Sequence, residues 1–204
     1  MSRRTRTRRF HSGALLAVLA IVLGLTAVSW HLVRPADEQL LHALVQRDAA
    51  TALALLEQGA SADARVEEGE HRGKTALMLA VQTGDTALVE QLLRAGAPVE
   101  ADNGRGGTAL MYAATRGDTA IVARLLEAGA ELDRQAANGW TALMLAAAKG
   151  HRRVIGQLAE AGADLDRADV YGWTPLMRAA GQGDVATGSL LLALGADPAL
   201  RNDQ

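Results

Sequence analysis

Apolar residues along the chain fall into two different patterns. Near the N-terminus they form one unbroken run, residues 13–33, which contains no charged residue. Further along they recur in short clusters such as Leu88, Val89, Leu92 and Leu93, and this spacing is typical of a helix that buries one face. The first pattern predicts a segment of membrane-spanning length, and the second predicts a series of short amphipathic helices.

The residues that flank each cluster predict where the helices begin and end. Thr75 precedes an apolar stretch, and a threonine in this position can accept hydrogen bonds from the free backbone N–H groups of a helix start. This predicts a first helix over 75–83 that ends before Gly84. A second helix is predicted over 85–95, with Gly96 as its C-terminal cap.

The same pair of helices recurs with a period of 33 residues. The motif T-[AP]-L-M opens each copy at Thr75, Thr108, Thr141 and Thr174, and a closing pair follows at Gly96-Ala97, Gly129-Ala130, Gly162-Ala163 and Gly195-Ala196. An earlier, degenerate copy has Gln39-Leu-Leu-His-Ala43 at the motif position, and four extra residues separate it from the next copy. We therefore predict five repeats, at about 38–70, 71–103, 104–136, 137–169 and 170–202.

A 33-residue period with T-[AP]-L-x-x-A, a central glycine and a closing Gly-Ala pair resembles the ankyrin family. The resemblance implies an all-α repeat fold over residues 37–204, in which a solenoid of about five helix-turn-helix repeats carries β-hairpin fingers between repeats. Each repeat must stack on its neighbour, because one helix pair cannot bury its own apolar faces. Where the family usually has His, this chain has methionine, which we interpret as core packing: Met78, Met111, Met144 and Met177.

The N-terminal segment predicts attachment to a membrane. Residues 1–12 form a basic tail with five arginines, and the uncharged residues 13–33 would span roughly 30 Å as a hydrophobic helix. Because basic flanks stay in the cytoplasm, we expect a single-pass anchor in a bacterial inner membrane with the repeat domain in the periplasm. The alternative is a cleaved secretory signal, with Ala27-Val28-Ser29 before the cut, which would leave the domain periplasmic or secreted.

Charge and composition narrow the range of functions. From Ala36 onward, 15 Lys and Arg stand against 23 Asp and Glu, which disfavours a nucleic-acid partner and favours a basic or mixed protein surface. The chain has no Cys, and its five His residues are not at metal-ligand spacing. Asp164, Asp166 and Asp169 lack the spacing of a calcium loop, so we interpret them as surface carboxylates. We expect no catalytic residue, no metal and no cofactor, and therefore no enzyme.

The resemblance also implies where a partner would bind, because ankyrin proteins usually use the finger tips and the exposed ends of the first helices. The predicted protein-binding residues at these positions are Arg72, Lys74, Arg105, Arg116, Asn138, Trp140, Lys149, Tyr171, Trp173 and Gln182. They change from basic in the early repeats to aromatic in the late ones, and Trp, Tyr and Arg are the common hot-spot types at interfaces. Alternatively, each aromatic residue only packs on the neighbouring finger.

These features together predict a monomeric scaffold for protein binding. The first hypothesis is an exported, membrane-tethered adaptor that stabilises or regulates an envelope or periplasmic protein. The alternatives are a secreted effector that acts on a host protein and, with less support, a regulator of an enzyme through a small ligand. No capping repeat follows the last copy, so we expect part of the apolar face near residues 190–194 to remain uncovered, either as imperfect capping or as a partner site.

Overall fold

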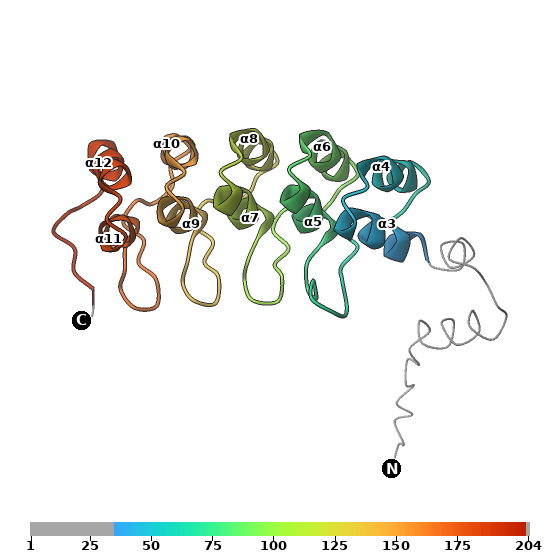
Figure 1. The fold of residues 1–204 in the computed structure, drawn as a ribbon, viewed down its shortest axis with the longest axis horizontal. Helices are drawn as coiled ribbons and strands as arrows, with labels where there is room; N and C mark the ends of the chain where they lie inside the picture. The colour runs from blue at the N-terminus through green and yellow to red at the C-terminus, as the bar shows by residue number, and fades with distance from the viewer. Residues whose placement is uncertain (1–34, 203–204) are drawn as a thin grey trace, which may run out of the picture.

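The protein is a row of stacked helix pairs (Figure 1). The computed structural model describes residues 35–202, so the basic tail, the hydrophobic segment 13–33 and the helix predicted there lie outside the described residues. Within the described part of the chain, no helix combines the length and the apolar character that a membrane span requires. The membrane anchor therefore stays a prediction from the sequence.

Residues 35–202 contain ten helices, two in each of five repeats. The pairs are α3 (Ala36–Val45) with α4 (Ala49–Glu57), α5 (Ala76–Thr83) with α6 (Thr86–Arg94), α7 (Ala109–Arg116) with α8 (Thr119–Glu127), α9 (Ala142–Ala148) with α10 (Arg152–Glu160), and α11 (Pro175–Gly181) with α12 (Val185–Leu194). The first helices form one row and the second helices a parallel row beside it, which is the upper row in Figure 1.

Helix starts are fixed by side-chain caps. The hydroxyl of Thr75 accepts a hydrogen bond from the N–H of Met78 at 3.2 Å, and the fourth and fifth repeats have the same bond. The carboxylate of Asp85 accepts from the N–H of Leu88 at 3.0 Å and so begins α6. A cap of this kind contributes about 1 kcal/mol. The helices predicted over 75–83 and 85–95 are confirmed to within one residue at each end, since Thr75 and Asp85 are caps outside the helices.

Small and aliphatic side chains fill the space between neighbouring repeats. The alanines of the first helices are at most 1% exposed: Ala76, Ala80, Ala109, Ala113, Ala142 and Ala146. Side chains this small let α5, α7 and α9 pack directly on one another in sequence order. The methionines of the second, third and fourth repeats are buried, which confirms core packing there, whereas Met177 in the fifth repeat is half-buried.

The fingers are tight turns, and the prediction of β-hairpins is not confirmed. Within residues 35–202 the only bridge outside the helices is an isolated antiparallel pair, Arg65 with Thr75, at the longer first finger. In the later fingers one or two backbone hydrogen bonds close the turn, as when Asn103 N–H donates to the carbonyl of Gly107 at 3.0 Å. Each of these fingers is too short for its two halves to form a ladder of several backbone hydrogen bonds.

The fifth repeat leaves apolar side chains in solvent, and one of them, Leu192, lies in the predicted range 190–194. Val185 at the start of α12 is 77% exposed, and Leu192 further along the same helix is 47% exposed. Leu191, between them in the core, is fully buried. The row therefore ends in an uncovered apolar surface on the C-terminal side.

Candidate protein-binding surface

The finger tips and the first helices lie on one side of the molecule. In Figure 1 all the fingers project from the same side of the row, beyond the first helices and away from the second helices. We call the surface formed by residues 71–83, 104–116, 137–149 and 170–182 the tip surface; each range runs from a finger tip to the end of a first helix. All ten predicted binding residues lie within these ranges.

The predicted residues differ in how much of each side chain solvent can reach. Those that are exposed are Arg72, Arg105, Arg116, Asn138, Lys149, Tyr171 and Gln182. Lys74, Trp140 and Trp173 are half-buried. The structure brings the two tryptophans together in one cluster, whereas most of the exposed residues are spread along the row.

The cluster is centred on Arg178, a residue of α11. Its guanidinium carbon lies 4.9 Å from the ring centre of Trp140 and also 4.9 Å from that of Trp173. Trp140 comes from the preceding repeat, and Trp173 from the finger that leads into α11. A cation between two aromatic faces is stabilised by both rings, with about 0.5–2 kcal/mol for each contact depending on exposure. This stack joins the last two repeats at the tip surface.

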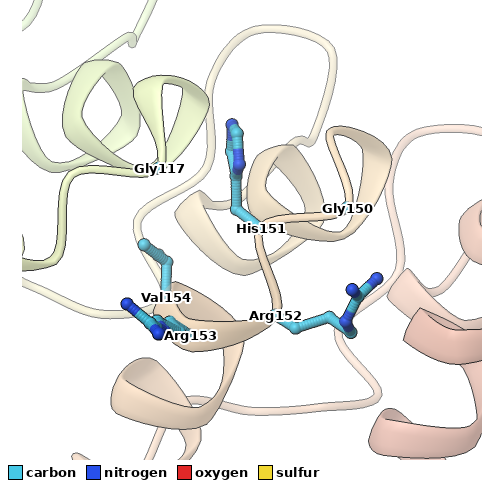
Figure 2. Close-up of a pocket in the computed structure, with 6 residues that line it drawn as sticks. All are labelled: Gly117, Gly150, His151, Arg152, Arg153 and Val154. Atoms are coloured by element: carbon cyan, nitrogen blue, oxygen red, sulfur yellow. The ribbon is translucent and has the colours of Figure 1, made fainter.

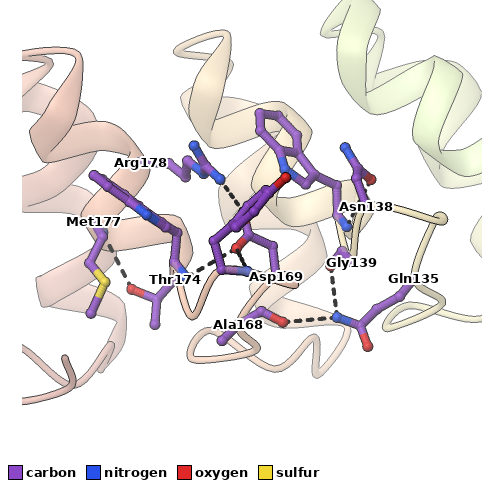
Figure 3. A network of polar contacts seen from close by, with 11 residues as sticks. Gln135, Asn138, Gly139, Ala168, Asp169, Thr174, Met177 and Arg178 are labelled. Atoms are coloured by element: carbon purple, nitrogen blue, oxygen red, sulfur yellow. Dashed lines mark hydrogen bonds and ion pairs between the residues drawn. The ribbon is translucent and has the colours of Figure 1, made fainter. Parts of the chain in front are cut away.

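Asp169 anchors the stack from below (Figure 3). Its side chain is 0% exposed and one oxygen, Oδ2, accepts a short hydrogen bond from Arg178. The other, Oδ1, accepts from the backbone N–H groups of Tyr171 at 2.9 Å and Trp173 at 3.1 Å. One buried carboxylate therefore fixes both the last finger and the arginine that its tryptophan covers.

These contacts keep Asp169 ionised. Burial pushes the pKa of this carboxyl upward, because a charged group loses its hydration. The hydrogen bonds from Arg178 and from the backbone of Tyr171 and Trp173, together with the positive charge of Arg178, outweigh burial and bring the pKa below its ordinary value. Two opposite charges thus balance each other under an aromatic surface, while the buried Nε of Arg178 has no hydrogen-bond partner.

A related arrangement occurs two repeats earlier. The ammonium of Lys74 lies 5.7 Å from the ring centre of Tyr112 in the next repeat. The amide of Asn103 donates to the Tyr112 hydroxyl at 3.0 Å, and its Oδ1 accepts from the N–H groups of Arg105 and Gly107 at 3.0 Å each. Asn103 and Tyr112 thus occupy the repeat positions of Asp169 and Arg178, with the cation and the aromatic ring exchanged.

Side chains also tie each finger to the next one. Gln135 Nε2 donates to the carbonyl of Gly139 in its own finger at 2.7 Å and to that of Ala168 in the following finger at 2.9 Å (Figure 3). Arg65 makes the equivalent bridge from the first finger to the carbonyls of Gly73 and Asp102. Fingers braced in this way lose little conformational entropy when a partner binds.

A hollow of about 320 Å³ lies away from the finger tips, at the start of α10. It is lined by Gly117, Gly150, His151, Arg152, Arg153 and Val154. Arg152 and Arg153 point away from each other in Figure 2, toward opposite sides of the hollow. The two guanidinium groups therefore do not converge on one ligand position.

Sequence reasoning missed two residues of the cluster, Asp169 and Arg178. The interpretation of Asp169 as a surface carboxylate is wrong, because its side chain is buried beneath the last finger. The sequence did contain a signal for the role of Asp169. Asn103 stands at the same repeat position two copies earlier, and the side chains of Asn103 and Asp169 can both accept hydrogen bonds from the backbone N–H groups of a finger. The three aromatic residues of the fingers differ in their surroundings. Trp140 and Trp173 pack around Arg178, whereas the side chain of Tyr171 is 62% exposed.

Stacked helix pairs with braced fingers define the class of helical repeat proteins, which use extended surfaces for binding. The family model described as ankyrin repeats (3 copies) matches residues 40–136 and 110–202. The chain belongs to the ankyrin repeat family, as the sequence motifs predicted. Among curated proteins the comparison finds no match.

Ankyrin repeats support a role in protein–protein interaction, and proteins built from them are typically scaffolds without catalytic activity. The family therefore agrees with the kind of partner predicted, a protein, but does not identify it.

Proposed function

We propose that the chain binds a partner protein through the tip surface, with the last two repeats providing the apolar centre of the interface. The observation that supports this most is the exposure of large apolar side chains on a rigid finger: Tyr171 is 62% exposed and Val170 is 57% exposed. Both lie beside the buried Asp169, which fixes the finger backbone. An exposed aromatic side chain on a preorganised support is typical of an interface hot spot.

The remaining predicted residues extend this surface toward the N-terminal repeats. Arg72, Lys74, Arg105, Arg116 and Lys149 line the earlier part, and Asn138 and Gln182 flank the aromatic cluster. Polar and charged residues around an apolar centre usually set the orientation and specificity of a complex more than its affinity.

Site-specific photo-crosslinking in the native cell tests the proposal. A photoreactive phenylalanine analogue replaces Tyr171 in one variant and Val185 in a second variant; Val185 is equally apolar and 77% exposed, but it begins a second helix. We expect a discrete crosslinked adduct from position 171 and none from position 185, because only the first position lies on the tip surface. An adduct from 185 with none from 171 would contradict the proposal.

We also propose that residues 13–33 tether the repeats to the inner membrane, with the repeats in the periplasm and the partner an envelope protein. Five arginines followed by an uncharged segment of membrane-spanning length support this topology. The full-length mass should persist in washed membranes, and protease should digest the repeats only after the outer membrane is opened. A soluble product that lacks its first residues would instead show signal cleavage.

A further inference from the structure

Charge is divided between the two sides of the row. The tip surface carries six basic residues and no Asp or Glu: Arg72, Lys74, Arg105, Arg116, Lys149 and Arg178. From Ala36 onward the chain as a whole has 15 basic and 23 acidic residues, so the acids lie in the second helices, in the turns just before and the loops just after them, and in the first repeat. The tip surface therefore has the opposite sign to the rest of the repeat region.

Most basic residues of the tip surface have no carboxylate partner. Arg178 is paired with Asp169, but within residues 35–202 the other five form no ion pair with a carboxylate. Outside the tip surface three arginines have acidic partners: Arg94 pairs with Glu90, Arg124 with Glu90 and Glu127, and Arg134 with Glu100 and Asp102. Basic side chains left without carboxylates are available for the acids of a partner.

Exposed acidic residues mark one end of this basic surface. Glu67, Glu68 and Glu70 are exposed in the longer first finger, just before Arg72. At the other end are the apolar side chains of Val170 and Tyr171. The surface between them thus runs from an acidic border, through basic side chains of the second to fourth repeats, to an aromatic and apolar end.

We infer that the tip surface binds an extended acidic segment of the partner, with an aromatic or large apolar residue next to the acidic stretch. The carboxylates lie along the basic residues from Arg72 to Lys149, and the apolar residue packs against Tyr171 and Val170. This inference rests on the proposed function and adds the chemistry of the partner. Complementary charge steers the segment, and apolar contact at the last finger sets its direction.

Selection of random dodecapeptides displayed on phage, with the full-length chain as bait, tests this chemistry. We expect selected sequences to combine several Asp or Glu residues with one aromatic or large apolar residue. The affinity of a labelled synthetic copy is then measured by fluorescence anisotropy. Two triple variants are compared: Arg72→Glu with Arg105→Glu and Lys149→Glu on the tip surface, and Arg94→Glu with Arg153→Glu and Arg201→Glu elsewhere. Circular dichroism confirms that both fold.

The tip-surface variant should weaken binding by about tenfold or more, and the control variant, with the same change in net charge, should leave binding nearly unchanged. Equal affinity for the two triple variants would overturn the inference. So would tighter binding of a single-stranded oligothymidylate than of the peptide, because basic and aromatic side chains also suit that class of ligand.

Failure of the inference and failure of the proposed function give different results. Neutral or basic peptides that lose about tenfold in affinity on Tyr171→Ala would overturn the acidic preference while keeping the tip surface as the binding side. Peptides whose affinity changes with neither Tyr171→Ala nor the tip-surface triple variant would overturn both.

Discussion

Individual residues of the candidate site owe their positions to contacts across repeats. Arg178 is held between Trp140 and Trp173, and its charge is balanced by the buried Asp169. The same carboxylate fixes the backbone of the finger that carries Tyr171. Loss of one carboxylate should therefore affect both stability and the presentation of the exposed aromatic side chain.

Asp169→Asn should lower the free energy of unfolding by about 2–3 kcal/mol, because Arg178 loses a charged hydrogen-bond partner in a largely buried site. Asp164→Asn is the matched control, since Asp164 is exposed, and it should change stability by less than about 0.5 kcal/mol. Urea denaturation followed by circular dichroism measures both. Equal effects of the two substitutions would show that Asp169 does not anchor the cluster.

The contribution of Asp169 should depend on pH. Its pKa is lower in the folded protein than the ordinary value of 3.8, so its stabilisation is fully present above that value. The stabilisation is lost as pH falls through the lowered pKa of the folded state, because the carboxyl then binds a proton in both states. The stability gap between the natural chain and Asp169→Asn should therefore narrow on acidification; a gap that widens would contradict this assignment.

The sequence indicated the positions of the finger aromatics but not the role of the buried carboxylate. Trp140 and Trp173 stand directly before a repeat threonine and Tyr171 stands two residues before Trp173, so the period fixes their place at the finger tips. The role of Asp169 depends on burial under a finger and on an arginine nine residues away in sequence. Composition and motif spacing carry no information on that burial, so a surface carboxylate was the natural interpretation.

At the scale of elements, the helices were predictable and the form of the fingers was not. Capping residues and glycines mark the helix ends in the sequence, so α5 and α6 begin and end within one residue of the predicted positions. The finger geometry is determined instead by how closely successive fingers pack. A β-carbon on Gly139 would lie 2.6 Å from the backbone nitrogen of Val170 in the next finger. Glycine is therefore required there by packing as well as by its positive φ.

Gly139→Ala should disturb the last finger, whereas Gly104→Ala should not. Both glycines have a φ of 79°, so both substitutions carry a similar backbone cost of about 1 kcal/mol. Only at Gly139 would the added methyl group meet neighbouring backbone; around Gly104 nothing lies within 4 Å. Gly139→Ala should therefore lower the unfolding free energy more and should reduce crosslinking from position 171. Equal stability of the two variants would argue against close finger packing.

At the scale of the whole molecule, the row of repeats separates surfaces of different chemistry. The net negative charge of the repeat region suggested a basic or mixed partner surface, but net charge averages over all sides of a molecule. The repeat geometry places the first helices and finger tips together, and the tip surface has only basic charges. The charge of a binding surface could therefore be assigned only once each repeat position was located in space.

The central claim is that a partner binds on the side formed by the finger tips and the first helices. Hydrogen–deuterium exchange of the full chain, free and with the partner identified by crosslinking, tests this claim most directly. We predict slower exchange on binding in the fingers at 105–107, 138–140 and 171–173, with little change in α6, α8 and α10. Protection confined to those second helices, with the fingers exchanging as in the free chain, would contradict the account.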